Sequence, residues 1–269
     1  MTRLIAFLFT MFPLVCLAQT TTTEVEIPGH FDAFTTDELG NVYALRGDVL
    51  ELFDTDGRSW LRNSLKTFGR INTIDAFYSL KPMVFSAEQG QLAVLDNTLS
   101  VQGGIMNLSR SGFTQVVRAC MSVQNHFWFF DERELSLVRV DAQLRPVANT
   151  GRLDQLLGHT IAPTAMQEHE NWLYVNDPER GILVFDLFGT YARTIPIKGA
   201  ISFEVRERKI LFLNKELGGE VYDMRSFAIE PLPVPVPEGA TLRDLRTERG
   251  LWYMLLADRI VIRGIPSER

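Results

Sequence analysis

Residues 172–185 read Trp172-Leu173-Tyr174-Val175, then a polar turn, then Ile182-Leu183-Val184-Phe185. They form one of six apolar, aromatic-rich hairpins, whose first strands begin at residues 42, 83, 127, 172, 210 and 251. The steps between these starts are 41, 44, 45, 38 and 41 residues. A four-stranded unit of about 40–45 residues cannot bury both of its faces alone, so it must stack on its neighbours around a ring. The period predicts an all-β, six-bladed propeller.

An aspartate recurs where the second strand ends in five of the six hairpins. The five examples are Asp54, Asp96, Asp141, Asp186 and Asp223. The pattern fits two interpretations: metal binding, and capping of the following turn by the aspartate's own side chain. Each aspartate belongs to a different blade, and the alternating acids of a calcium loop are missing. We therefore expect turn capping.

A shorter, more polar strand precedes each hairpin, and in a propeller this innermost strand lines the axial channel. Aligning these segments predicts one layer of channel-lining side chains: Asp32, Asp75, Arg118, Thr164, Ser202 and Arg243. Charges of mixed sign can pair and fill a narrow channel with satisfied polar groups and water. They can also bind a small polar ligand. Both interpretations stay open at this point.

The ring needs closing, because an open strand edge invites aggregation. The sixth unit has almost no chain left after Ile262 for an outer strand. Residues 22–27 come directly before the inner strand of the first unit. In the same way, the outer strand of the fourth unit comes directly before the inner strand of the fifth unit. We therefore expect the N-terminal strand to complete the last blade, so that residues 19–269 form a single domain.

The first eighteen residues have the layout of a secretory signal peptide. Arg3 supplies the positive charge, an apolar stretch follows, and Ala18 provides a small residue at the cut before Gln19. Cleavage would leave Cys120 as the sole cysteine, with 26 basic against 33 acidic side chains and a net charge of −7. This balance argues against nucleic-acid partners. We expect an exported protein, periplasmic or extracellular, with no membrane span in the mature chain.

Motifs of common enzymes are missing from the sequence. There is no Gly-x-Ser-x-Gly elbow, no His-Glu-x-x-His, no Walker loop and no dinucleotide fingerprint. The four histidines are scattered over different units. The dense segment Glu168-His169-Glu170 is expected in a solvent-facing turn rather than in a metal site. The prediction is a protein that is not an enzyme and has no catalytic residues, no metal and no cofactor.

The unit at residues 181–195 resembles the NHL-type six-bladed propellers, as does Asp37-Glu38-Leu39-Gly40-Asn41-Val42-Tyr43. Related six-bladed families include TolB-like periplasmic proteins and secreted lactonases. The resemblance extends over the mature chain as a period and is sharp only in the first and fourth units. It implies the fold and a general habit of binding proteins or ligands, and it brings no catalytic residues.

Three hypotheses about function follow. The first is a non-enzymatic protein-interaction scaffold, such as a periplasmic subunit of an outer-membrane transport or secretion assembly. The second is a binder of a small polar ligand or glycan, with Trp60 and Phe113 as surface-contact candidates that could equally pack between blades. The third, suggested by the lactonases, is a metal-dependent hydrolase using Asp32, Asp75 and Glu204 at the channel mouth.

Overall fold

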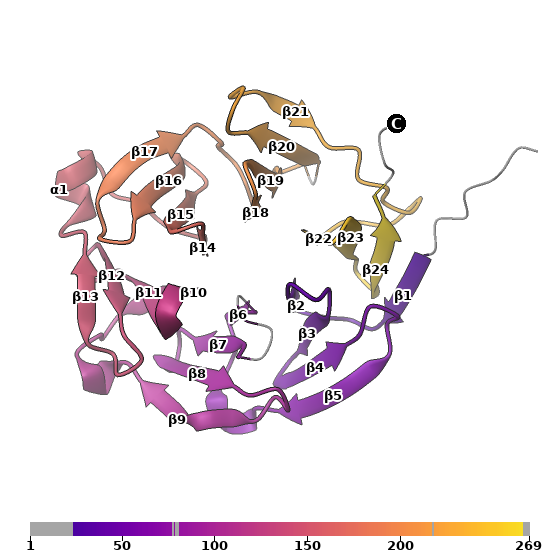
Figure 1. Cartoon of the computed structure of the whole chain (residues 1–269), viewed down its shortest axis with the longest axis horizontal. Coiled ribbons are helices and arrows are strands. Elements are labelled where there is room, and N and C mark those ends of the chain that lie inside the picture. Colours follow the sequence, from indigo (N-terminus) through magenta and orange to yellow (C-terminus); the bar gives the residue numbers. More distant parts are fainter. Residues whose placement is uncertain (1–23, 77, 79–80, 217, 266–269) are drawn as a thin grey trace, which may run out of the picture.

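The structure, a computed structural model, describes residues 24–76, 78, 81–216 and 218–265. Six four-stranded antiparallel sheets stand around a common axis, which confirms the predicted all-β, six-bladed propeller (Figure 1). The predicted signal peptide, residues 1–18, lies outside the described residues. No helix within the described ranges is long and apolar enough to cross a membrane.

Blades 1 to 3 follow one another along the chain, each with its first strand innermost. Their strands are β2 (Ala33–Thr36), β3 (Val42–Arg46), β4 (Val49–Phe53) and β5 (Ser59–Ser64) in blade 1; β6 (Thr73–Asp75), β7 (Met83–Ser86), β8 (Gln91–Leu95) and β9 (Val101–Asn107) in blade 2; and β10 (Val116–Ser122), β11 (His126–Asp131), β12 (Ser136–Val140) and β13 (Pro146–Asn149) in blade 3. Short 3-10 turns occupy Lys66–Phe68, Ser109–Ser111 and Val123–Asn125.

Blades 4 to 6 repeat this plan after the short helix α1 (Leu153–Leu157). Their strands are β14 (Ala165–His169), β15 (Trp172–Asp177), β16 (Gly181–Asp186) and β17 (Tyr191–Ile195) in blade 4; β18 (Ser202–Arg206), β19 (Lys209–Leu213), β20 (Gly219–Asp223) and β21 (Ile229–Pro231) in blade 5; and β22 (Asp244–Glu248), β23 (Leu251–Leu255), β24 (Arg259–Gly264) and the N-terminal β1 (Glu24–Pro28) in blade 6.

Because neighbouring strands alternate in direction, the turns divide between two faces of the ring. The upper face carries the turns between first and second strands and between third and fourth strands, including residues 37–41, 170–171, 187–190 and 224–228. The lower face carries the remaining turns and the connections between blades, α1 among them. These two names are used below.

The core lies between adjacent blades, where each sheet packs its apolar face on the next. Between blades 4 and 5, for example, Tyr174 and Ile182 of one sheet cluster with Phe203 and Ile210 of the other. The first and last blades pack in the same way, with Phe31 and Phe53 against Tyr253. Since the apolar alternation of every hairpin serves this packing, the six hairpins located in the sequence are the six blade centres.

The N-terminal strand closes the ring, as predicted. β1 pairs antiparallel with β24 from Glu24↔Arg263 to Pro28↔Arg259. Ile27, 1% exposed, enters the cluster that joins blades 6 and 1. Ion pairs reinforce the seam, with Glu26 Oε1 lying 3.0 Å from Nε of Arg259. Both ends of the described chain therefore belong to one sheet.

The recurrent aspartates cap turns on the upper face, as expected. Oδ1 of Asp186 accepts hydrogen bonds from the backbone N–H groups of Phe188 and Thr190, at 2.9 and 2.8 Å. The other four, Asp54, Asp96, Asp141 and Asp223, accept equivalent pairs of backbone N–H groups. Each carboxylate is thereby committed to its own turn.

Candidate functional site

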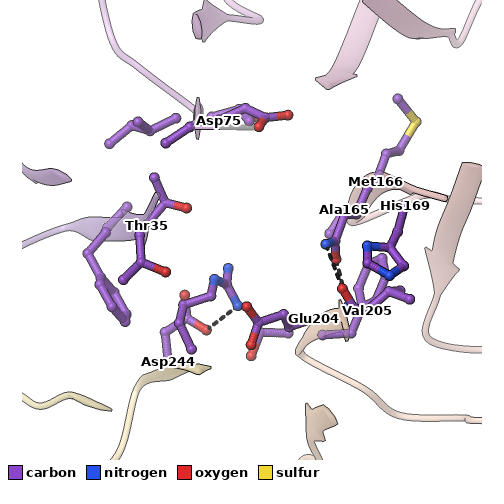
Figure 2. Close-up of a pocket in the computed structure, with 18 of the residues that line it drawn as sticks. Thr35, Asp75, Ala165, Met166, His169, Glu204, Val205 and Asp244 are labelled. Atoms are coloured by element: carbon purple, nitrogen blue, oxygen red, sulfur yellow. Dashed lines mark hydrogen bonds and ion pairs between the residues drawn. The ribbon is translucent and has the colours of Figure 1, made fainter. Parts of the chain in front are cut away.

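The inner strands of all six blades surround an axial cavity of about 490 Å³. Its wall combines polar and apolar side chains, and Figure 2 shows Thr35, Asp75, Glu204 and Asp244 arranged around an open centre. Among the described residues, seven carboxylates and three guanidinium groups line it: Asp37, Glu38, Asp75, Glu168, Glu204, Asp244 and Glu248, with Arg118, Arg206 and Arg246. The cavity therefore carries an excess of negative charge.

The six side chains predicted to form one layer lie at three heights along the axis. The backbone N–H groups of Asp32, Thr164 and Arg243 donate to the hairpin strands just before the inner strands begin. Arg118 and Ser202 lie one residue higher, and Asp75 lies two residues above that. The single layer is wrong because a short polar strand has no apolar alternation that would fix its register in the sequence.

Two pockets divide these six residues. Asp75, Arg118, Thr164 and Ser202 line the axial cavity, whereas Asp32 and Arg243 line a second pocket of about 600 Å³ on the lower face. Oδ2 of Asp32 accepts the backbone N–H of Gly47 at 2.6 Å. Arg243 donates to the carbonyl of Phe31 in blade 1, and Arg118 donates to that of Thr164 in blade 4. These arginines join neighbouring blades.

A belt of side chains at one height links successive inner strands. Asp75, Gln167 and Glu204 occupy the same position in blades 2, 4 and 5. Each accepts a backbone N–H from the next blade, at 2.7 to 2.8 Å. The donors are the N–H groups of Met121, Val205 and Thr247. Since buried charged acceptors are costly when unpaired, the belt satisfies polar groups and holds the blades in register.

The buried thiol of Cys120 occupies the same belt position in blade 3. Burial raises the pKa of this thiol well above its ordinary value, an effect that a hydrogen bond from the Glu168 backbone opposes. A thiol held in its neutral form is a poor nucleophile. Cys120 therefore belongs to the core.

The segment Glu168–His169 corrects the expectation of a solvent-facing turn. Both residues end the inner strand β14, and Glu168 is 2% exposed. Its carboxylate accepts the indole N–H of Trp128 at 2.8 Å and the backbone N–H of Val123 at 3.0 Å. The inner strand continues through Glu168 and His169 because these partners in blade 3 compensate the buried charge.

His169 also lines the axial cavity (Figure 2). It lies beside Val205 of blade 5, and its Nε2 atom is buried without a hydrogen-bond partner among the described residues. The sequence predicted His169 in a solvent-facing turn, whereas the structure places it in the wall of the cavity.

A short chain of charges crosses from blade 5 to blade 6 at the upper end of the cavity. The guanidinium of Arg206 contacts Glu204 at 3.2 Å and Glu248 at 2.6 Å. Burial alone would lower the pKa of Arg206, but the two carboxylates raise it. With two acids for one base, this sector keeps a net negative charge and a fixed geometry.

The residues suggested for a metal-dependent hydrolase are not brought together. Asp75 and Glu204 line the axial cavity, while Asp32 lies in the lower-face pocket. In the part of the chain that the structure describes, no three His, Cys, Asp or Glu side chains form a group that could hold a metal ion.

The two surface-contact candidates have different environments. Trp60 is 63% exposed on the outer strand β5. Phe113 is only 9% exposed and packs edge-on against Phe129, with ring centroids 5.4 Å apart. Phe113 is thus corrected from a surface candidate to a core residue, because its loop folds back over the cluster between blades 2 and 3.

No family model matches the chain, and no curated protein matches its sequence. Solved structures do resemble it. Virginiamycin B lyase from Staphylococcus aureus aligns with a TM-score of 0.63 at 10% identity, over 91% of this chain and 99% of that one. A streptogramin B lyase aligns with a TM-score of 0.61 at 12% identity, over 90% and 97%. The WD40 domain of Neurospora crassa Pan2 aligns with a TM-score of 0.57 at 10% identity, over 89% and 76%.

These likenesses show the propeller fold and leave the NHL or TolB assignment a prediction. They also contradict the prediction that the protein is not an enzyme, because two of the neighbours are lyases. The motifs that the sequence lacks belong to other folds, so their absence does not exclude catalysis in a propeller. At 10–12% identity no residue of a lyase is transferred to this chain.

Proposed function

We propose that the protein binds a small, positively charged organic molecule in its axial cavity. The observation that carries the proposal is the excess of carboxylates over guanidinium groups around one cavity. A cavity with one dominant sign of charge and low-dielectric walls concentrates oppositely charged ligands. Its volume of about 490 Å³ lies within the range of small-molecule sites.

The arrangement also supports proton transfer to or from the bound molecule. His169 lines the cavity from blade 4, and Glu38 lines it from blade 1. An amine or guanidine held by the carboxylates would lie within the space that this imidazole borders. A reaction of such a ligand is compatible with the lyase neighbours, although they do not identify it.

The test is titration of the purified protein with agmatine, a dication, followed by calorimetry and thermal shift. Binding should weaken as NaCl rises, since salt screens charge attraction. Glu38→Gln should weaken binding about fivefold, because one unit charge at about 7 Å contributes about 1 kcal/mol at an effective dielectric constant near 40. Glu38 is exposed, so the fold should tolerate this change.

Glu238→Gln is the matched control, because it removes the same charge from an exposed position away from the cavity. It should leave agmatine affinity unchanged. Equal losses in the two variants would indicate attraction by overall charge alone, and the axial site would be abandoned. Absence of any agmatine binding at low salt would refute the proposal outright.

A second candidate is an exported protein-interaction scaffold, such as a subunit of an envelope assembly. Its support is a pair of exposed aromatic rings on the upper face, Phe188 at 80% and Phe227 at 71% exposure. The export part is tested by N-terminal sequencing of the mature protein: a chain that begins at Met1 would overturn it.

A further inference from the structure

Five of the C–D turns, which join the third and fourth strands on the upper face, share one backbone device. In each turn the residue that donates its N–H back to the capping position has a positive φ: Gly57, Leu99, Leu144, Gly189 and Phe227. Glycine adopts this left-handed conformation freely, whereas a bulky side chain is strained in it. Blades 1 and 4 use glycine.

The three turns without glycine differ in whether the strained residue is buried. Leu99 and Leu144 are buried in the cores between blades, so packing compensates the strained backbone. Phe227 has a φ of 61° and is nevertheless 71% exposed. No contact within the described protein compensates the strain at Phe227 to the same degree. A strained, exposed aromatic residue is a feature of functional surfaces.

Other exposed apolar side chains occupy the same face. Phe188 projects from the C–D turn of the neighbouring blade 4, where the hydrogen bonds to Asp186 fix the turn. Trp172, 39% exposed, stands next to the cavity-lining His169 in the strand register. The upper end of blade 4 therefore leads from the acidic cavity, past an indole ring, to an exposed phenyl ring.

We propose that the upper face is a docking surface for an extended segment of a partner protein. One basic side chain of this segment enters the axial cavity, and its apolar side chains cover Phe227 and Phe188. The proposal rests on the proposed function, because it uses the same negative cavity. The basic residue is inferred because its charge complements the negative cavity. The apolar residues are inferred because the rings of Phe227 and Phe188 are exposed.

The spacing of the blades fixes the spacing within such a segment. The third strand of a blade lies two strand spacings, about 10 Å, outside the first. An extended chain advances about 3.3 Å per residue. The basic residue and the apolar residue should therefore lie about three to five positions apart.

The experiment is selection of a random dodecapeptide library, displayed on phage, against the full mature protein. Enriched sequences should carry Arg or Lys, with an aromatic or aliphatic residue three to five positions away. Their affinity should fall at least tenfold for Phe227→Gly and for Phe188→Ser. The control Leu156→Ser removes a half-exposed apolar side chain from α1 on the lower face and should change nothing.

Phe227→Gly also separates docking from folding. Because glycine relieves the positive φ, the variant should melt at or above the temperature of the parent protein while it loses peptide binding. Loss of binding together with a clearly lower Tm would mean that Phe227 is a structural residue, which overturns the proposal. Equal loss in Leu156→Ser, or enriched peptides without a basic residue, would overturn it as well.

The outcomes keep the two proposals apart. Agmatine binding without any enriched peptide retains the cavity site and rejects the docking surface. Peptides that depend on Phe227 but do not compete with agmatine also reject the docking model, because the basic side chain would then lie elsewhere. Binding of phosphatidylcholine vesicles that is lost in Phe227→Gly, with no enriched peptide, would assign the rings to a membrane surface and reject the protein partner.

Discussion

Ile27→Ala tests the closure of the ring at a single buried side chain. Ile27 is 1% exposed and packs into the cluster shared by blades 6 and 1. Truncation of a buried isoleucine to alanine costs about 2–5 kcal/mol. With a loss of about 3 kcal/mol, and about 2–4 °C per kcal/mol for a domain of this size, Tm should fall by roughly 6–12 °C.

Differential scanning calorimetry of the purified protein measures this shift, with Glu26→Ala as the control on the same strand. Glu26 is half exposed and contacts Arg259. A surface ion pair of this kind contributes about 0–1 kcal/mol, so the control should melt within about 4 °C of the parent. Deletion of residues 19–28 should cause aggregation, because it bares the edge of β24. If Ile27→Ala melted like the control, β1 would not be the strand that closes the ring.

Three further predictions concern the interior. Glu204→Ala removes the acceptor of the Thr247 backbone N–H and hydroxyl. It should lower the free energy of unfolding by about 3 kcal/mol in urea titrations. A loss below about 1 kcal/mol would contradict the stabilising role given to the belt. Burial raises the pKa of Tyr253 to about 12, so the unfolded phenol ionises first. The free energy of unfolding should then fall between pH 10 and 12, and Tyr253→Phe should reduce that fall. An unchanged fall in Tyr253→Phe would show that Tyr253 is not its cause. In thermal melts, Phe113→Ala should lower the free energy of unfolding by about 3–5 kcal/mol, and Trp60→Ala should lower it by less than about 0.5 kcal/mol. Similar losses in the two variants would contradict the assignment of Phe113 to the core and of Trp60 to the surface.

The sequence predicted the blades well because their signal is strong and local. Each hairpin combines apolar alternation with a polar turn, and packing between blades uses that alternation directly. The capping aspartates were also predictable, since an Asx turn needs only its own side chain and the next few backbone groups. The closing strand followed from counting strands.

The site was harder to predict because its chemistry depends on contacts between distant residues. Glu168 was expected in solvent, and only its pairing with Trp128, forty positions away, explains its burial. The belt of Asp75, Gln167 and Glu204 has no sequence motif, because the partners are backbone N–H groups. Asp32 lies three residues below Asp75 in the strand register, so the two line different pockets.

Closure by the first and last strands also has a consequence for how the chain folds. Glu24 pairs with Arg263, 239 positions later, so the final seam joins nearly the whole length of the polypeptide. Bringing such distant ends together costs about 5 kcal/mol of chain entropy, beyond a constant term. The first five blades can assemble from local hairpins as the chain emerges, but the sixth must wait for the last residues. A nascent chain therefore carries an unpaired strand edge until β24 has been made.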